Sequence, residues 1–274
     1  MQLSSNKRKA FLSFQPPAIG PEEIAAVTET LESGWLTTGP RAEELERRLA
    51  ELTGARHALA VASGTAAMHL SLVGLGLGPG DEVITTPITW PATANVIVHT
   101  GAKPIFVDVL DSDLNIDPDL VAAAVTERTK AILPVDLAGQ PADLDPLLGL
   151  GFPVVEDAAH AVEARYRGRR IGSIARDRHA LHLYIVRIDA EDAGADRDAY
   201  QRALAEENIG TSIHFLPVHT LTYYREHFPK QPPLPVAERA GREVLSLPLS
   251  PAHSDEDIAD AVDALRRVHA RFAS

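Results

Sequence analysis

The sequence contains no cysteine among its 274 residues. That absence excludes disulfides, thiolate catalysis and zinc sites built on thiolates. It also contains no apolar run of about eighteen residues, the length that a membrane-spanning helix requires. Residues 1–10 are polar and basic, with no apolar stretch behind them. We therefore expect a soluble, cytoplasmic protein with neither a signal peptide nor a transmembrane segment.

The chain also has no excess of basic residues. The chain has 26 Lys and Arg against 38 Asp and Glu, which gives a net charge of -12 and a pI near 5.3. This balance argues against a nucleic-acid partner or an anionic membrane surface, although a local basic pocket for a phosphate is compatible with it. The eleven histidines lack zinc-site spacing: His179 and His182 lie three residues apart, but in an expected strand. We expect no metal site.

Short apolar strands alternate with helical segments in the first part of the chain, after two helices at 21–33 and 40–53 that end at Gly34 and Gly54. We expect the strands at residues 57–62, 82–86, 104–108, 130–135 and 153–156. Such alternation predicts βαβ units, hence an α/β fold with a mostly parallel sheet and flanking helices.

The pattern changes after residue 177. Residues 181–188 and 211–215 are expected strands, and helices are expected at 196–207 and from 254 to the C-terminus. We place a domain boundary here, which gives a large domain at 1–177 and a smaller C-terminal α/β domain at 178–274. Residues 1–15 are expected to form a flexible arm.

An acid ends the strand at 153–156. Asp157 follows it directly, and two alanines then lead to His160. Ligands of open α/β sheets bind beyond the carboxyl ends of the strands, where an acid can hold a cofactor ring nitrogen in its protonated form. The alternative is that Asp157 caps the next turn. The residues alone leave both interpretations open.

Two other strand ends carry suitable chemistry. Ser63, Gly64 and Thr65 form a turn into a helix, where free backbone N–H groups and hydroxyls can hold a phosphate; a hydroxyl N-cap is the alternative, and for this tripeptide alone the more frequent one. Trp90 follows the next strand and can stack on a planar ring, unless it is a core residue. Together with Asp157 these residues suit a phosphate, a ring face and a ring nitrogen.

An ordered set of motifs along nearly the whole chain, about 11–270, resembles the pyridoxal phosphate (PLP)-dependent nucleotide-sugar aminotransferases, the DegT/DnrJ group. The motifs are GWLTTGP at 34–40, SGTAA at 63–67, GPGDEV at 78–83, TPITW at 86–90, IFVDV at 105–109, GQPAD at 139–143, EDAAHA at 156–161, GTSIHF at 210–215 and LSLPL at 245–249.

The resemblance implies a fold-type I aminotransferase, with a large PLP-binding domain and a small domain that closes over the site. It implies a transferase that passes an amino group from glutamate or glutamine to a keto-sugar nucleotide, and a homodimer. By position, Ser63, Gly64 and Thr65 would bind the PLP phosphate, Trp90 would stack on the ring, and Asp157 would pair with the ring nitrogen. His160 would lie beside the ring.

The chain departs from the family pattern in its centre. In the family, the segment after the position of residues 172–174 carries the Schiff-base lysine, whereas here residues 172–177 run directly into 178–184, which truncates the large domain. The lysines of the chain are Lys7, Lys9, Lys103, Lys130 and Lys230. No lysine lies between residues 131 and 229, so PLP, if bound, would be held noncovalently.

Three hypotheses follow, in order of preference. The first is a family member whose PLP pocket is partly preserved and whose activity is lost or greatly reduced. The second is a non-catalytic subunit that pairs with a complete paralogue. The third is an enzyme of altered chemistry that uses His160 as its base. His179 or His182 as a substitute for the missing lysine is a less favoured alternative.

Overall fold

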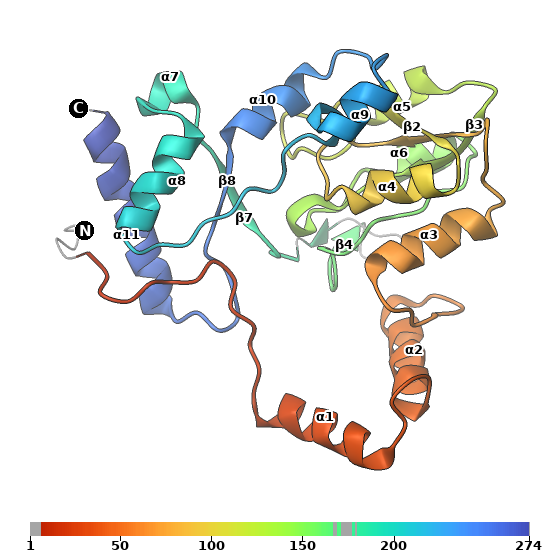
Figure 1. The fold of residues 1–274 in the computed structure, drawn as a ribbon, viewed down its shortest axis with the longest axis horizontal. Helices are drawn as coiled ribbons and strands as arrows, with labels where there is room; N and C mark the ends of the chain where they lie inside the picture. The colour runs from red at the N-terminus through yellow and green to blue at the C-terminus, as the bar shows by residue number, and fades with distance from the viewer. Residues whose placement is uncertain (1–6, 167–168, 171–176, 179, 274) are drawn as a thin grey trace.

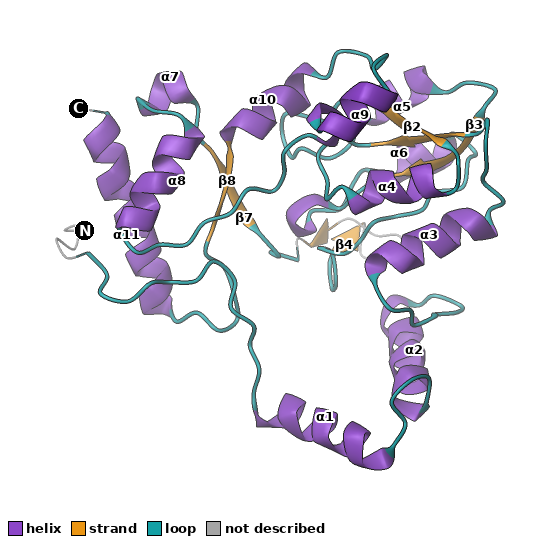
Figure 2. Ribbon diagram, viewed as in Figure 1, coloured by secondary structure: helices purple, strands orange, loops and turns teal. Residues whose placement is uncertain are grey.

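The computed structural model describes residues 7–166, 169–170, 177–178 and 180–273. A parallel sheet forms the centre of the larger part, in the order β2-β1-β3 (Figures 1 and 2). Its strands are β1 (Glu82–Thr85), β2 (Lys103–Phe106) and β3 (Thr129–Leu133). The register places Ile84 opposite Ile105 on one side and Ile132 on the other. The predicted parallel α/β sheet is confirmed.

Residues 153–157 extend this sheet beside β3. Val155 N donates to Ile132 O at 2.9 Å, and parallel bridges join Ile132 to Val154 and Val135 to Asp157. The predicted strand is thus present as isolated bridges. Because parallel strands end at a common edge, Asp157 lies at the same edge of the sheet as the end of β1.

A pair of helices covers each face of the sheet. Because successive side chains of a strand point to opposite faces, neighbouring strand residues pack against different helix pairs. Val83 and Ala131 pack in one apolar cluster with α3 (Gly64–Gly74) and α4 (Ala92–His99). Their neighbours Ile84 and Ile132 pack in another with α5 (Pro118–Ala124) and α6 (Leu144–Gly149). The remaining short elements of this part are η1 (Leu137–Gly139), β4 (Arg165–Tyr166), β5 (Arg169–Arg170) and β6 (Asp177–Arg178).

The smaller part is built on an antiparallel pair, β7 (Tyr184–Arg187) and β8 (Val244–Leu247). Its helices α8 (Arg197–Glu206) and α11 (Asp255–Phe272) pack together, and α7 (Ala190–Ala193) precedes them. The segment between α8 and β8 crosses back over the larger part (Figure 1). It contains η2 (Val218–Thr220), α9 (Thr222–His227) and α10 (Pro235–Glu243).

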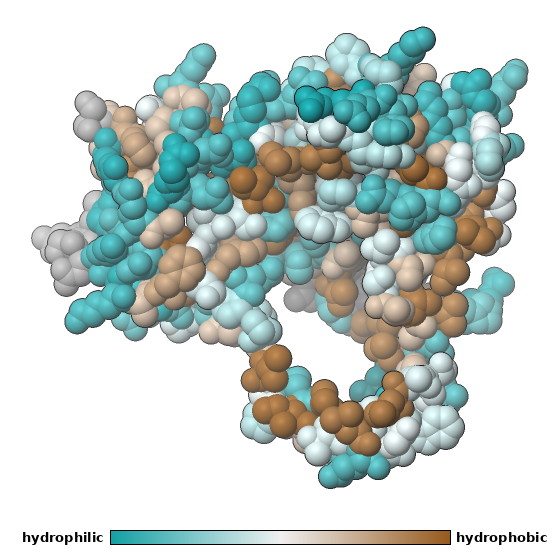
Figure 3. Space-filling view, viewed as in Figure 1, coloured by the Kyte–Doolittle hydropathy of each residue, from teal (hydrophilic) through white to brown (hydrophobic). Residues whose placement is uncertain are grey.

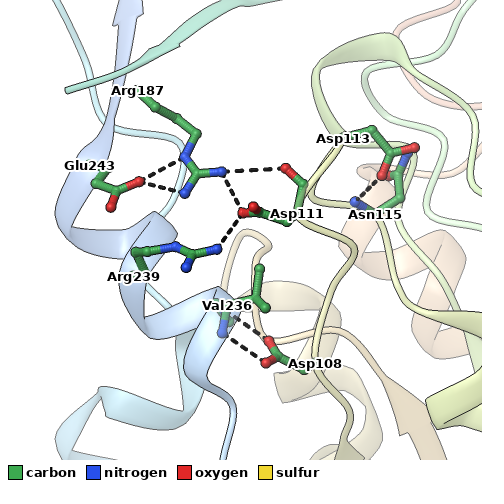
Figure 4. Close-up of polar contacts among 9 residues, drawn as sticks. Asp108, Asp111, Asp113, Asn115, Arg187, Val236, Arg239 and Glu243 are labelled. Atoms are coloured by element: carbon green, nitrogen blue, oxygen red, sulfur yellow. Dashed lines mark hydrogen bonds and ion pairs between the residues drawn. The ribbon is translucent and has the colours of Figure 1, made fainter. Parts of the chain in front are cut away.

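Polar contacts join the two parts at the start of α10 (Figure 4). The buried carboxylate of Asp108 accepts hydrogen bonds from Val236 N at 2.9 Å and Ala237 N at 2.8 Å, so it caps α10 from the end of β2. Arg187 bridges Glu243 and Asp111, at 2.6 Å each. These contacts fix the segment from α9 to β8 against the sheet.

Three expectations were wrong. The described part of the arm is packed rather than free: Leu12 is 5% exposed and bridges Ile209. Residues 57–62 form no strand, because no described strand lies beside them to complete a ladder. Residues 211–215 contribute a single bridge, between Ser212 and Ser246.

The first two helices project from the body, with an open space between α1 and the remaining fold (Figures 1 and 3). They are α1 (Pro21–Ser33) and α2 (Pro40–Thr53), and each ends at the predicted glycine in the left-handed conformation. Among the helices described, none combines the length and the apolar character that a membrane crossing needs.

Candidate functional site

A small cavity lies at the carboxyl edge of the sheet. It is lined by Thr89, Trp90, Val135, Asp157, Ala159, His160 and Phe215. Trp90 comes from the loop after β1, and Asp157 and His160 follow the strand beside β3. The structure therefore brings three of the predicted site residues together.

The backbone of Asp157 is held by the sheet. Its N–H donates to Pro134 O at 2.9 Å, and its carbonyl accepts from Asp136 N at 3.1 Å. The two oxygens of its carboxylate have different partners: Thr93 Oγ1 donates to Oδ2 at 2.8 Å, and Ala159 N donates to Oδ1 at 3.3 Å. Asp157 thus supports the following turn with one oxygen and lines the cavity as well, so the two interpretations left open by the sequence are compatible.

A threonine relay continues from this carboxylate. Thr89 Oγ1 and Thr93 Oγ1 are 2.7 Å apart, and both side chains are buried. Thr93 lies in the first turn of α4, and Thr89 lies in the loop that precedes this helix. The relay orients the carboxylate of Asp157.

Trp90 stands at the mouth of the cavity. Its side chain is 65% exposed, so it is not a core residue. Its ring meets Phe215 edge-on, with the centroids 6.3 Å apart. A flat indole face at this place remains available for stacking.

His160 is packed between two rings. It stacks on His182 at 4.5 Å and on Phe215 at 5.9 Å between centroids. Desolvation, reinforced by His182 and His214, lowers the pKa of His160 to about 4, so the ring is neutral at physiological pH. Its Nδ1 accepts from Ala138 N at 3.3 Å, which places the ring proton on Nε2.

Two further carboxyl groups lie behind Asp157. Asp136 is fully buried, accepts from Ala142 N at 2.9 Å through Oδ1, and lies beside Glu156. Burial raises the pKa of Asp136 well above its usual range, and the charges of Glu156 and Asp157 raise it further. Burial beside these two carboxyl groups therefore favours the protonated form of Asp136. No pattern in the sequence indicates this pair, because the contact depends on the register of 134–136 against 155–157.

The predicted phosphate turn lies at the start of α3. Ser63 Oγ accepts from Ala66 N at 3.1 Å, so Ser63 is the N-cap of this helix. Ser63, Gly64 and Thr65 are exposed and are not among the residues that line the cavity. A Cβ at Gly64 would meet nothing within 4 Å, which leaves its backbone open to a ligand.

The residues present fit pyridoxal phosphate in their chemistry. A fixed carboxylate suits a protonated ring nitrogen, an exposed indole suits the ring face, and a capped helix start suits a phosphate. The cavity itself is small, about 40 Å³. Among the described residues, no group of three or more His, Asp or Glu side chains is placed to hold a metal ion.

Comparison with known proteins supports one family. The model of the DegT/DnrJ/EryC1/StrS aminotransferase family matches residues 17–177 and 174–266. The spore coat polysaccharide biosynthesis protein SpsC of Bacillus subtilis (strain 168) is 35% identical over 381 residues, covering 96% of this chain and 98% of SpsC. Because the chain has only 274 residues, that alignment includes a long stretch of SpsC without a counterpart here.

Solved structures agree. Spr1654 from Streptococcus pneumoniae, described as a sugar aminotransferase and solved in its PMP form, is 26% identical and superposes with a TM-score of 0.89 over 96% of this chain and 98% of its own. The aminotransferase TlmJ from Streptoalloteichus hindustanus is also 26% identical, with a TM-score of 0.85 over 96% of this chain and 100% of its own.

Proposed function

Because the chain belongs to the DegT/DnrJ/EryC1/StrS aminotransferase family, we propose that its cavity at Asp157 is a pyridoxal phosphate site of a sugar aminotransferase whose activity is lost or greatly reduced. The observation that carries this proposal is the convergence of Asp157, Trp90 and His160 on one cavity. The reaction of the site would pass an amino group from glutamate or glutamine to a keto-sugar nucleotide.

The residues of the chain have separable roles. Asp157, oriented by Thr93, would hold a proton on the ring nitrogen, and Trp90 would cover one face of the ring. Ser63, Gly64 and Thr65 would hold the phosphate. Bound pyridoxal phosphate supplies an electron sink for amino-group transfer.

The loss of activity follows from the missing amine. No lysine lies between residues 131 and 229, so the chain offers no ε-amino group near the cavity from that region. The family model matches this chain in two blocks that meet at residues 174–177. This supports the absence of the segment that carries the lysine in the family.

The histidines of the site do not replace the lysine. The Nδ1 lone pair of His160 is engaged by Ala138 N, and its Nε2 carries the proton, so the ring donates at neutral pH. His182 stacks on His160, and burial lowers its pKa as well. His179, the other predicted substitute, lies outside the described residues. The site therefore has the residues to hold the cofactor but lacks the amine that the reaction uses.

Pyridoxal phosphate binding tests the proposal. We expect saturable quenching of tryptophan fluorescence by the cofactor, with no adduct retained after borohydride reduction and denaturation. Asp157→Asn should weaken binding at least tenfold, because the carboxylate no longer pairs with the protonated ring nitrogen. Asp119→Asn, on the exposed side of α5, is the matched control and should leave binding unchanged.

Two results would sink the proposal. A borohydride-fixed adduct on Lys103, Lys130 or Lys230 would show that the chain retains a covalent anchor. Equal affinity of the parent chain and Asp157→Asn would show that this carboxylate does not contact the cofactor.

A second candidate function is a non-catalytic subunit that pairs with a complete paralogue. Exposed apolar side chains favour it, among them Trp35 and Leu36 in the turn between α1 and α2. Size-exclusion chromatography with light scattering, on the chain alone and mixed with a full-length relative, separates the two candidates. A monomer in both runs contradicts the subunit.

A further inference from the structure

The first helix has no core beneath it. None of the 13 residues of α1 is buried, and Ile24, Val27 and Leu31 are 61%, 60% and 61% exposed. Their spacing of three and four residues places them on one face. A helix of this length is marginal in water unless its apolar face is packed. The face of α1 therefore needs a cover.

The cover has a preformed seat. Ala26, Val27, Thr30, Leu31, Leu36 and Arg41 line a groove between α1 and the start of α2. An ion pair between Glu29 and Arg41 also joins the two helices. Figure 3 shows apolar side chains gathered along α1 on the side of the open space. We call this surface the α1–α2 seat.

A second feature nearby in the sequence also lacks a neighbour. Residues 57–62 have the apolar character of a strand, yet they pair with no strand among the described residues. Leu59 is 76% exposed. An unpaired strand edge is a template for an added strand. A single partner that covers both features needs an apolar face for the seat and a strand for residues 57–62.

The relatives indicate where such a cover comes from. This chain superposes on Spr1654 over 96% of its length, so its helices and sheet keep the arrangement that the complete relative has. SpsC contains a long stretch without a counterpart here, and the two family blocks of this chain meet at 174–177. The chain therefore keeps the arrangement of its relatives without a stretch that SpsC contains.

We propose that this chain binds, in trans, a separate polypeptide equivalent to the stretch that its relatives carry between the two blocks. This inference rests on the proposed function in one respect, the absence of the central segment from this chain. The binding itself needs no cofactor. The partner lays an apolar face on the α1–α2 seat and adds a strand to residues 57–62. A second copy of the chain lacks that stretch, and in a complete relative the stretch belongs to the relative's own fold. Neither can supply it as well as a separate polypeptide can.

The probe is the unmatched stretch of SpsC, co-expressed with the full chain as a separate tagged polypeptide. We expect the two to co-purify as a one-to-one complex. Hydrogen exchange measured by mass spectrometry should slow at least tenfold in 21–33 and 57–62 relative to the chain alone. Leu31→Glu should weaken the complex at least tenfold, whereas the same substitution at the exposed Leu120 of α5 should not. These readouts need no pyridoxal phosphate, so their outcome is independent of the test of the proposed function.

A fusion keeps the test decisive if the separate stretch is insoluble. The same stretch is inserted at the junction of the two blocks, and exchange in 21–33 is measured again. Protection in the fusion but none from a soluble separate stretch overturns binding in trans, and no protection in the fusion overturns the seat itself. If the chain alone protects 21–33 in a concentration-dependent manner, a second copy is the occupant and the proposal is wrong.

Discussion

Replacement of Asp136 by Asn should make the stability of this protein less dependent on pH. The amide oxygen can still accept from Ala142 N, and the amide N–H₂ can still donate to Glu156. The variant therefore imitates the protonated form of Asp136 and removes one titrating group from the buried pair. It leaves the cavity residues untouched.

The sign follows from the direction in which the pKa moves on folding. Burial and the neighbouring carboxylates raise the pKa of Asp136 in the folded state, whereas in the unfolded chain it is about 3.9. Its protonated form thus stabilises the fold fully below about pH 3.9, and this contribution is lost as pH rises toward the folded-state pKa.

The magnitude scales with the pKa shift on folding. A folded-state pKa that lies one pH unit above the unfolded value corresponds to about 1.4 kcal/mol of stability. The stability advantage of Asp136→Asn over the parent should therefore grow from pH 4 to pH 8, by about 1.4 kcal/mol for each unit by which folding raises this pKa.

Urea unfolding followed by circular dichroism at several pH values measures this difference. Histidine contributions on the acid side occur in both proteins, since the lowered pKa of His160 costs stability as pH falls below about 6.5 toward 4. The difference between the two curves isolates the pair. Asp119→Asn controls for the change in net charge. Parallel curves for the parent and Asp136→Asn, offset by a constant free energy, would refute the raised pKa of Asp136.

The remaining predictions concern α10. Asp108→Ala should reduce the free energy of unfolding by about 2–4 kcal/mol, because two backbone N–H groups in the first turn of α10 lose a buried carboxylate; a loss under about 1 kcal/mol in urea unfolding would contradict this cap. Gly241→Ala should cost about 1–3 kcal/mol, because its Cβ would lie 2.3 Å from Pro217 Cδ. Gly149→Ala, where nothing lies within 4 Å, is its control and should show no such loss.

The sequence could predict those parts of the site that follow from strand ends. Asp157 and Trp90 each follow an apolar strand, and parallel strands end at one edge, so their convergence needed no knowledge of the register. The contact between Asp136 and Glu156 does need the register, since a slip of one residue would turn a side chain to the other face. The boundary at 177 stays a prediction.

Residues 57–62 show what the sequence could not predict. Their composition favours a strand, but a strand exists only when a neighbour completes its hydrogen bonds. The packed arm is another case, because nothing in residues 7–15 indicates that Leu12 pairs with Ile209 from the far end of the chain. Long-range partners decided both outcomes.

The cavity and the α1–α2 seat should differ in local stability, because long-range contacts hold the cavity but not the seat. Phe215 packs in a buried cluster with Ile88, Phe106 and Val244, so that cluster joins both parts of the chain. Asp108 and Arg187 tie the parts together as well. None of these contacts involves α1 or α2. Exchange should therefore be slow around the cavity and fast in 21–33 within the same molecule, because local opening follows the contacts that each segment makes. We therefore expect the cavity to stay ordered while the first two helices open locally.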